Sequence, residues 1–262
     1  MTGQTDNVFT MKGIKKYRPS VAWMALAVLL SALVTPHGSP HAQTMKRVDL
    51  ELVLAVDTSG SVDSKEYQLQ IEGLVQAFRD PAVIAAIIGT SATGGVAATV
   101  VHWSSSNEQE QIVPWTVLKN EDSALGFADA IAAAPTRSFS DSTGIGGVLQ
   151  YSERIIRRNR FAGRRKSIDV SGDGSNNSGI PPWLVRDMVT DEGITVNGLA
   201  ILTDEPYLHD YFAENVIGGA GAFVMTVNDY ADIVIGTRNK LLREISINIA
   251  LGHQPKMMTA RP

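Results

Sequence analysis

Short apolar runs alternate with helical patterns along this chain from residue 48 to residue 247. Runs of strand character occupy 48–56, 96–103, 112–118, 167–170, 194–202 and 222–227. Patterns with helical spacing occupy 64–78, 122–134, 146–159, 181–189, 207–216 and 230–247. Because helical crossovers join parallel strands, the alternation predicts an α/β fold with a Rossmann-like, doubly wound, mostly parallel sheet and helices on both faces. The polar stretch 104–111 is too short for a crossover, so it predicts a hairpin and one antiparallel edge strand.

The first 42 residues have the three-part pattern of a secretory signal peptide. The basic residues at its start are Lys12, Lys15, Lys16 and Arg18. An apolar run follows at 21–34, and Ala42 supplies a small residue before the expected cleavage point. The ten residues before Met11 add nothing to the pattern, so Met11 is a candidate start. An uncleaved anchor is the alternative, but the apolar run is shorter than the about 20 residues that span a bilayer.

The rest of the chain has the length of one domain. We expect a signal peptide at 1–42, a single domain at 43–249 and a C-terminal tail at 250–262, with the mature protein periplasmic or secreted and without a stable membrane anchor. The absence of cysteine excludes disulfides. Without residues 1–42 the chain has 19 Lys and Arg against 26 Asp and Glu. This acidic balance disfavours nucleic acids and anionic membranes as partners, because both are recognised by basic residues.

One basic cluster interrupts the acidic composition. It consists of Arg154, Arg157, Arg158, Arg160, Arg164, Arg165 and Lys166. We interpret it as a solvated helix C-terminus and the turn after it, where positive charge complements the helix dipole. A binding patch is the alternative.

The loop after the first predicted strand is rich in oxygen ligands. Residues 48–56 are followed by Asp57-Thr58-Ser59-Gly60-Ser61, so an apolar strand delivers one carboxylate and two hydroxyl groups to the same loop. Such oxygen ligands suit Mg²⁺, Mn²⁺ or Ca²⁺, whereas the nitrogen and sulfur ligands that zinc or copper favours are missing. The loop therefore predicts a site for a hard divalent cation.

Two further loops carry candidate ligands. Thr143 lies in a hydroxyl-rich loop that opens a helix, and Asp173 follows the strand at 167–170. In doubly wound sheets, ligands bind at the carboxyl ends of the strands near the point where the strand order reverses. The predicted metal ligands are therefore Asp57, Ser59, Ser61, Thr143 and Asp173.

This arrangement resembles the von Willebrand factor type A (vWA) family and its metal-ion-dependent adhesion site, MIDAS. The pattern is Asp-x-Ser-x-Ser, then a Thr before a glycine-containing helix start, then an Asp after a central strand. The resemblance covers most of residues 47–247. It implies a Rossmann-like fold, one divalent cation, with Mg²⁺ favoured and Mn²⁺ or Ca²⁺ possible, and binding in place of catalysis. It also implies that Ser59, Ser61 and Thr143 are direct ligands, with Asp57 and Asp173 acting through water.

Residues 169–174 read Asp-Val-Ser-Gly-Asp-Gly and are followed by Asn176 and Asn177. This departs from the commoner Thr-Asp-Gly ending and suggests a bacterial exported subgroup of unknown function. Asn176 and Asn177 either shape the rim of the site or are plain loop residues. Ser171 either adds a hydroxyl beside Asp173 or bonds to the backbone of the turn at Gly172.

Two functional hypotheses follow. In the first, the cation keeps exchangeable waters, and an Asp or Glu of a protein partner replaces one of them. In the second, the chain is a metal-dependent hydrolase acting on an anionic substrate, with His102 or Asp141 as the base. We favour the binding module, because the histidines are scattered and no residue beside the ligands has the character of a nucleophile. If Ser59, Ser61 and Thr143 are only turn and cap residues, the metal is absent.

Overall fold

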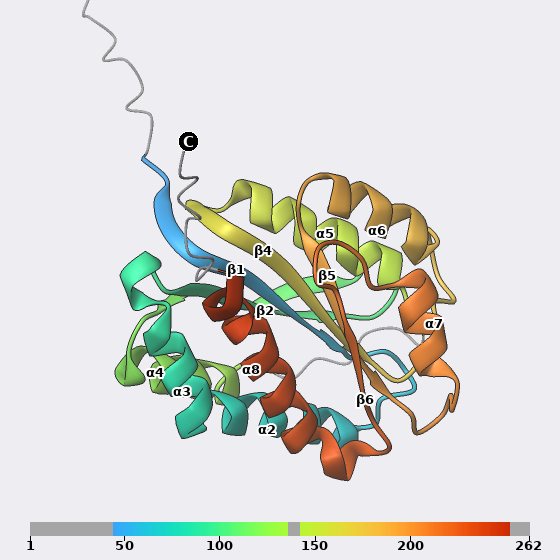
Figure 1. The fold of residues 1–262 in the computed structure, drawn as a ribbon. Coiled ribbons are helices and arrows are strands. Elements are labelled where there is room, and N and C mark those ends of the chain that lie inside the picture. Colours follow the sequence, from blue (N-terminus) through green and yellow to red (C-terminus); the bar gives the residue numbers. More distant parts are fainter. Residues whose placement is uncertain (1–43, 136–141, 252–262) are drawn as a thin grey trace, which may run out of the picture. The chain divides into compact units, whose positions relative to one another are not determined.

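A six-stranded mixed sheet forms the centre of the computed structural model, which describes residues 44–135 and 142–251 (Figure 1). The strands are β1 (Lys46–Asp57), β2 (Val96–Trp103), β3 (Gln109–Leu118), β4 (Phe161–Gly172), β5 (Thr195–Ile201) and β6 (Val224–Val227). They lie in the order β3-β2-β1-β4-β5-β6. Every neighbouring pair is parallel except β2 and β3. The predicted doubly wound sheet with one antiparallel edge strand is confirmed.

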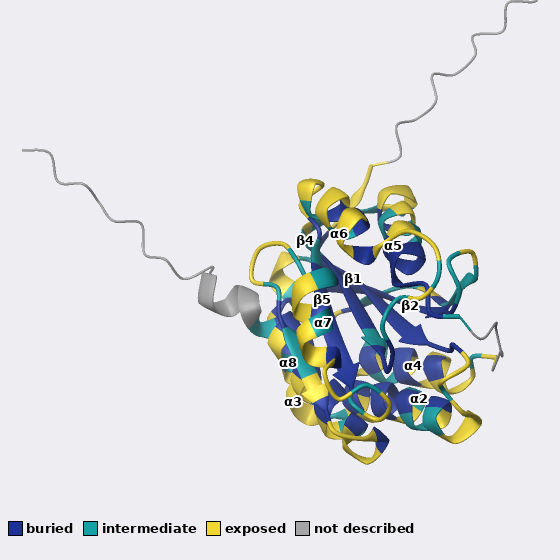
Figure 2. Ribbon diagram, turned by 90° about the vertical axis from the view of Figure 1, so that its right-hand side faces the viewer, coloured by how far each residue is buried: buried dark blue, intermediate teal, exposed yellow. Residues whose placement is uncertain are grey.

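The central strand β1 is almost wholly buried. Only its first two residues, Lys46 and Arg47, are exposed. Its apolar residues alternate between two cores, so that Leu52 packs with one cluster and Val53 with the other. A strand covered on both faces needs this nearly continuous apolar sequence. The strand is dark blue in Figure 2, which marks buried residues.

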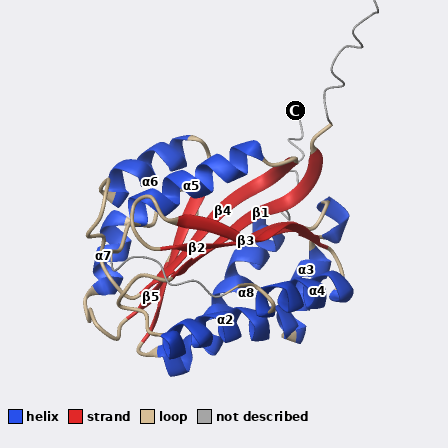
Figure 3. Ribbon diagram, turned by 180° about the vertical axis from the view of Figure 1, so that it is seen from behind, coloured by secondary structure: helices blue, strands red, loops and turns tan. Residues whose placement is uncertain are grey.

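Helices cover both faces of the sheet (Figure 3). One face carries α2 (Ser64–Arg79), α3 (Pro81–Gly89), α4 (Glu121–Ala132) and α8 (Ile233–Leu251). The other carries α5 (Ile145–Arg158), α6 (Pro182–Asp191) and α7 (Leu208–Asn215). Two short 3₁₀ helices are η1 (Ser91–Thr93) and η2 (Tyr230–Asp232). In the described part of the chain, no helix combines the length and the apolar character needed to cross a bilayer.

The loop after β1 ends where α2 is capped. The Asp63 carboxylate accepts hydrogen bonds from the backbone N–H groups of Lys65 (2.7 Å) and Glu66 (2.8 Å). The Glu66 carboxylate in turn accepts from the backbone N–H of Asp63 (2.8 Å). This capping box satisfies N–H groups that have no partner within the helix, and such caps contribute about 1 kcal/mol. It therefore holds the end of the loop that begins at Asp57.

The strand β4 is longer than predicted. It begins at Phe161 and not at residue 167. Residues 161–166 lack a strand-like apolar pattern, but they pair with β1, as in Lys46↔Phe161 and Glu51↔Lys166. That pairing comes from a segment distant in the sequence, so no local pattern revealed it. The interpretation of the basic cluster as a helix end and turn is wrong for Arg164, Arg165 and Lys166, which lie on β4.

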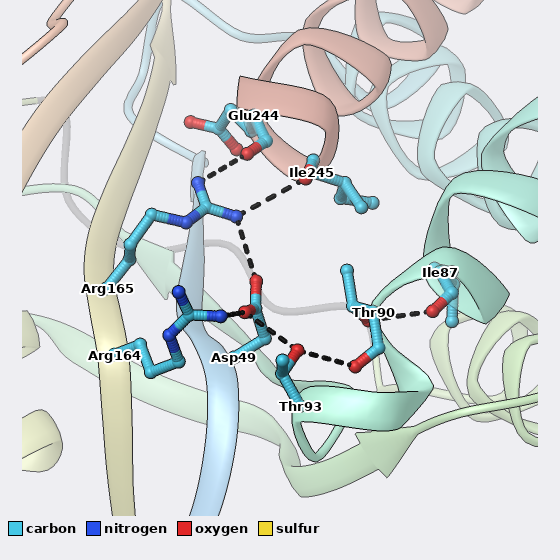
Figure 4. A network of polar contacts seen from close by, with 8 residues as sticks. All are labelled: Asp49, Ile87, Thr90, Thr93, Arg164, Arg165, Glu244 and Ile245. Carbon is cyan, nitrogen blue, oxygen red and sulfur yellow. Dashed lines mark hydrogen bonds and ion pairs between the residues drawn. The ribbon is translucent and has the colours of Figure 1, made fainter. Parts of the chain in front are cut away.

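A polar network centred on buried Asp49 explains why these basic residues enter the sheet (Figure 4). Arg164 and Arg165 form ion pairs with the Asp49 carboxylate at 3.0 and 3.4 Å, and Thr93 donates to it at 2.9 Å. Arg165 also donates to the backbone carbonyl of Glu244 in α8 (2.7 Å). The network therefore ties β1, β4, η1 and α8 together.

Candidate metal centre

The sheet topology brings the predicted ligands together at one edge. The order β3-β2-β1-β4-β5-β6 reverses direction between β1 and β4, which is where doubly wound sheets bind ligands. Asp57 is the last residue of β1, and Asp173 directly follows β4. Thr143 lies two residues before α5. All five predicted ligands are therefore in loops or strand ends at this crevice.

Four of these side chains form a chain of oxygen contacts. The hydroxyl oxygens of Ser59 and Ser61 are 3.2 Å apart, and Ser61 donates to Oδ1 of Asp173 at 2.6 Å. The Thr143 hydroxyl lies 3.5 Å from the Ser59 hydroxyl. Ser59, Thr143 and Asp173 are buried, whereas Ser61 is exposed. The cluster therefore opens to solvent on the Ser61 side.

Asp57 is fully buried with one carboxylate oxygen unsatisfied. Its Oδ1 accepts from the backbone N–H of Ser59 (2.8 Å), while Oδ2 has no hydrogen-bond partner among the described residues. A side chain at Gly172 would put its Cβ 2.8 Å from Oδ2, so glycine keeps this space open. Burial, with repulsion from Asp173 as a smaller cause, raises the Asp57 pKa to about 7. A buried carboxylate oxygen without a donor fits a site that holds a cation or its bound water.

Asp173 is held on both of its oxygens. Oδ1 accepts from Ser61, and Oδ2 accepts from the Tyr230 hydroxyl of η2 at 3.0 Å. Burial raises the pKa of Asp173. Tyr230 is the first residue of the helical pattern predicted at 230–247, and nothing in that pattern marks its hydroxyl as part of the site. Contact between residues this far apart in sequence follows only from the fold.

Two asparagines hold the Thr143 segment. Asn177 accepts from the backbone N–H of Thr143 at 2.8 Å, and the Thr143 carbonyl accepts from the N–H of Asn177 (2.9 Å) and of Ser178 (3.1 Å). Asn176 accepts from the N–H of Gly146 in the first turn of α5 (3.3 Å). Asn177 therefore contacts the candidate ligand Thr143 directly, whereas Asn176 holds the first turn of α5, which begins two residues after Thr143.

Ser171 follows neither of the alternatives drawn from the sequence. Its hydroxyl contacts the Ala55 carbonyl (3.3 Å) and the side-chain oxygen of Gln70 (3.2 Å). The amide nitrogen of Gln70 donates to the Asp57 carbonyl at 3.0 Å. Ser171 and Gln70 thus support the backbone at the end of β1.

His102, the first candidate base, is enclosed in the protein. It is fully buried and forms a hydrogen bond of 3.2 Å to the Tyr67 hydroxyl. Burial lowers its pKa to about 4. Such an imidazole is neutral at pH 7 and has no route to a substrate at the surface, so the structure does not support it as a base. Asp141, the second candidate, lies outside the described residues.

The donor set is that of a hard cation. It combines three hydroxyl groups and two carboxylates, without imidazole or thiolate. Among the described residues there is no group of three or more His, Cys, Asp and Glu side chains that could hold a metal.

One family model matches most of the sequence. It is described as "Protein of unknown function (DUF1194)" and matches residues 47–249. A search of curated proteins finds no match.

Solved structures share the fold at low sequence identity. Proximal thread matrix protein 1 from the mussel byssus has a TM-score of 0.51 and 18% identity, over 77% of this chain and 49% of that chain. Another structure of that protein has a zinc-occupied MIDAS motif. The pilus adhesin SpaC from Lactobacillus rhamnosus GG has a TM-score of 0.55 and 13% identity, over 76% of this chain and 30% of that chain.

A third relative has the size of a single domain. The vWF domain of the type V pili tip protein Mfa5 from Porphyromonas gingivalis has a TM-score of 0.52 and 12% identity, over 79% of this chain and 97% of that chain. The chain spans about half of the mussel protein and less than a third of SpaC. These likenesses show a vWA-like fold.

Proposed function

The chain belongs to the DUF1194 family, and from the oxygen cluster at its sheet edge we propose that it is a binding module for a divalent cation, with Mg²⁺ favoured. Ser59, Ser61 and Thr143 would be direct ligands. Asp57 and Asp173 would act through bound water. The observation that carries the proposal is the cluster of the Ser59, Ser61 and Thr143 hydroxyl groups, to which Asp57, with its buried and unpartnered Oδ2, is linked through the backbone N–H of Ser59.

The arrangement supports capture of an acidic partner. Neutral hydroxyl ligands do not reduce the positive charge of the metal. Asp173 accepts hydrogen bonds from protein donors on both oxygens, whereas among the described residues Asp57 accepts one on Oδ1 only. A cation held in this way keeps an electrophilic face toward solvent, on the side of exposed Ser61. An Asp or Glu of a protein partner would replace a bound water there, because hard cations prefer carboxylate oxygen.

An exported location completes the proposal. The signal-peptide pattern at 1–42 predicts a periplasmic or secreted protein. Proteins of similar fold include a pilus adhesin, a pilus tip domain and a byssus matrix protein. They support a role in adhesion or assembly outside the cytoplasm.

Titration calorimetry with Mg²⁺, Mn²⁺ and Ca²⁺ tests the metal site. Replacement of a direct ligand in Ser59→Ala should weaken binding by more than about tenfold, since even changes outside the ligand shell cost that much. Ser152→Ala is the matched control, because Ser152 is buried in α5 with no hydrogen-bond partner in the described chain. Equal affinities of Ser59→Ala and wild type would overturn the proposal.

A further inference from the structure

The helix α6 carries both buried and exposed apolar residues. Pro182, Val185 and Val189 are buried against the body of the protein. Four apolar residues outside this buried stripe are exposed, Ile180 just before the helix and three helix residues, and we call these four the α6 outer face. They are Ile180, Trp183, Leu184 and Met188, which are 43%, 44%, 42% and 64% exposed. A surface helix normally turns polar residues to solvent.

Exposed apolar side chains concentrate on this face. Eight large hydrophobic residues are exposed in the described part of the chain, and the α6 outer face contributes four of them. A fifth, Tyr207, lies in the loop after β5, at the same edge of the sheet as the candidate metal centre. Single exposed hydrophobic residues are ordinary, but a group on one helix indicates an interaction surface. Figure 2 shows the mixture of exposed and buried residues along α6.

The α6 outer face begins beside the candidate metal centre. The N–H of Ser178 donates to the Thr143 carbonyl at 3.1 Å. Gly179 packs against Ser106, and the Ile180 carbonyl lies against Gly146 in the first turn of α5. From Ile180 to Met188 the helix extends roughly 12 Å at about 1.5 Å per residue. About four residues of an extended partner chain cover that length.

A surface hollow lies near the far end of this face. It has a volume of about 360 Å³ and lies between α5 and α6, with Met188, Val185 and Val189 on one side. Gln150, Glu153 and Arg157 of α5 line the other, and the acidic residues Asp191 and Glu192 also line the hollow. The hollow is large enough for one apolar side chain of a partner segment that runs along α6 from the candidate metal centre.

The charges around this surface restrict the partner. Asp187 is 60% exposed on α6, where it forms an ion pair with Arg186 at 2.8 Å, and Asp191 ends the helix. Asp204, in the loop before α7, lies close enough to contribute to the raised pKa of Asp173. A segment with several acidic residues would be repelled at these points.

We propose that the partner is a protein segment that gives one carboxylate to the cation and lays large apolar side chains along the α6 outer face. The inference rests on the proposed function, because the cation sets where the carboxylate binds. The apolar contacts would supply affinity and select among acidic partners, since a hard cation alone does not discriminate between them.

A random dodecapeptide phage library tests the inference. The library is panned on the immobilised protein in Mg²⁺ and eluted with chelator. The enriched peptides should contain one Asp or Glu and a group of large apolar residues. Their synthetic forms should bind Trp183→Ser/Met188→Ser at least about tenfold more weakly than wild type, because burial of two large apolar side chains is lost.

The control variant is Ile88→Ser/Ile235→Ser, which removes two exposed apolar residues from α3 and α8. It should bind the peptides as wild type does, and both variants should retain Mg²⁺ affinity. Acidic peptides without an apolar group, bound equally by all three proteins, would overturn this inference and leave the proposed function intact. The absence of any chelator-sensitive enrichment would contradict both. Self-association lost in the α6 variant would identify a second copy as the occupant and also overturn the inference.

Discussion

Buried His102 has a pKa of about 4, below the ordinary value of 6.5, because burial disfavours the charged imidazolium. Burial raises the pKa of its neighbour Tyr67 to about 12, so their hydrogen bond joins two neutral groups at pH 7. The residue that the sequence offered as a candidate base is thus a packed core residue. The position of His102 near the end of β2 indicated that it lies close to the site. Its exposure could not be predicted, because it depends on α2, whose Tyr67 packs against the imidazole.

This burial predicts a pH dependence of stability. Between pH 6.5 and about 4 the unfolded chain binds a proton that folded His102 does not, so the free energy of unfolding falls as the pH is lowered through this window. The full loss attributable to His102 is about 3 kcal/mol. Urea unfolding at pH 7 and pH 5 should show a smaller drop for His102→Leu than for wild type. His209→Leu, at a half-exposed position, should follow wild type; identical pH dependence in all three proteins would be evidence against the buried neutral histidine.

At the scale of elements, a strand could be predicted from the sequence where its residues are buried and apolar. It could not be predicted where it forms only through pairing with a neighbouring strand. The apolar sequence of β1 predicts a central strand, and the structure confirms it. The first half of β4 has the sequence Phe-Ala-Gly-Arg-Arg-Lys and becomes a strand through pairing with β1 and through Asp49. Tyr230 is a second example, at the site. Its place in the last helical pattern was predictable from the sequence, whereas its hydrogen bond to Asp173 was not.

The Asp49 network predicts a large stability effect. Asp49→Asn leaves Arg165 without its carboxylate in a mostly buried setting, which should lower the free energy of unfolding by about 3 kcal/mol. The matched change Asp129→Asn breaks the exposed pair with Arg79 and should cost less than about 1 kcal/mol. Urea denaturation measures both. Equal small losses would mean that the network does not hold β1, β4 and α8 together.

At the scale of the whole molecule, the two ends of the sheet have different roles. The amino-terminal half of β1 is fastened by ion pairs to β4, and Arg165 of β4 in turn donates a hydrogen bond to α8. The carboxyl end holds the oxygen cluster between β1 and β4. Its general position was predictable, because the alternation of strands and helices predicts the sheet and the sheet predicts the edge that binds ligands. The contacts of Asn176, Asn177 and Ser171 were not, since short loops take their conformation from the surrounding fold.

The most direct test of the central claim is a crystal structure grown with Mn²⁺, with anomalous diffraction recorded to locate the metal. We expect one strong peak within bonding distance of the hydroxyl oxygens of Ser59, Ser61 and Thr143, with Asp57 and Asp173 reached through water. A peak elsewhere, or none at this sheet edge at saturating Mn²⁺, would contradict that claim.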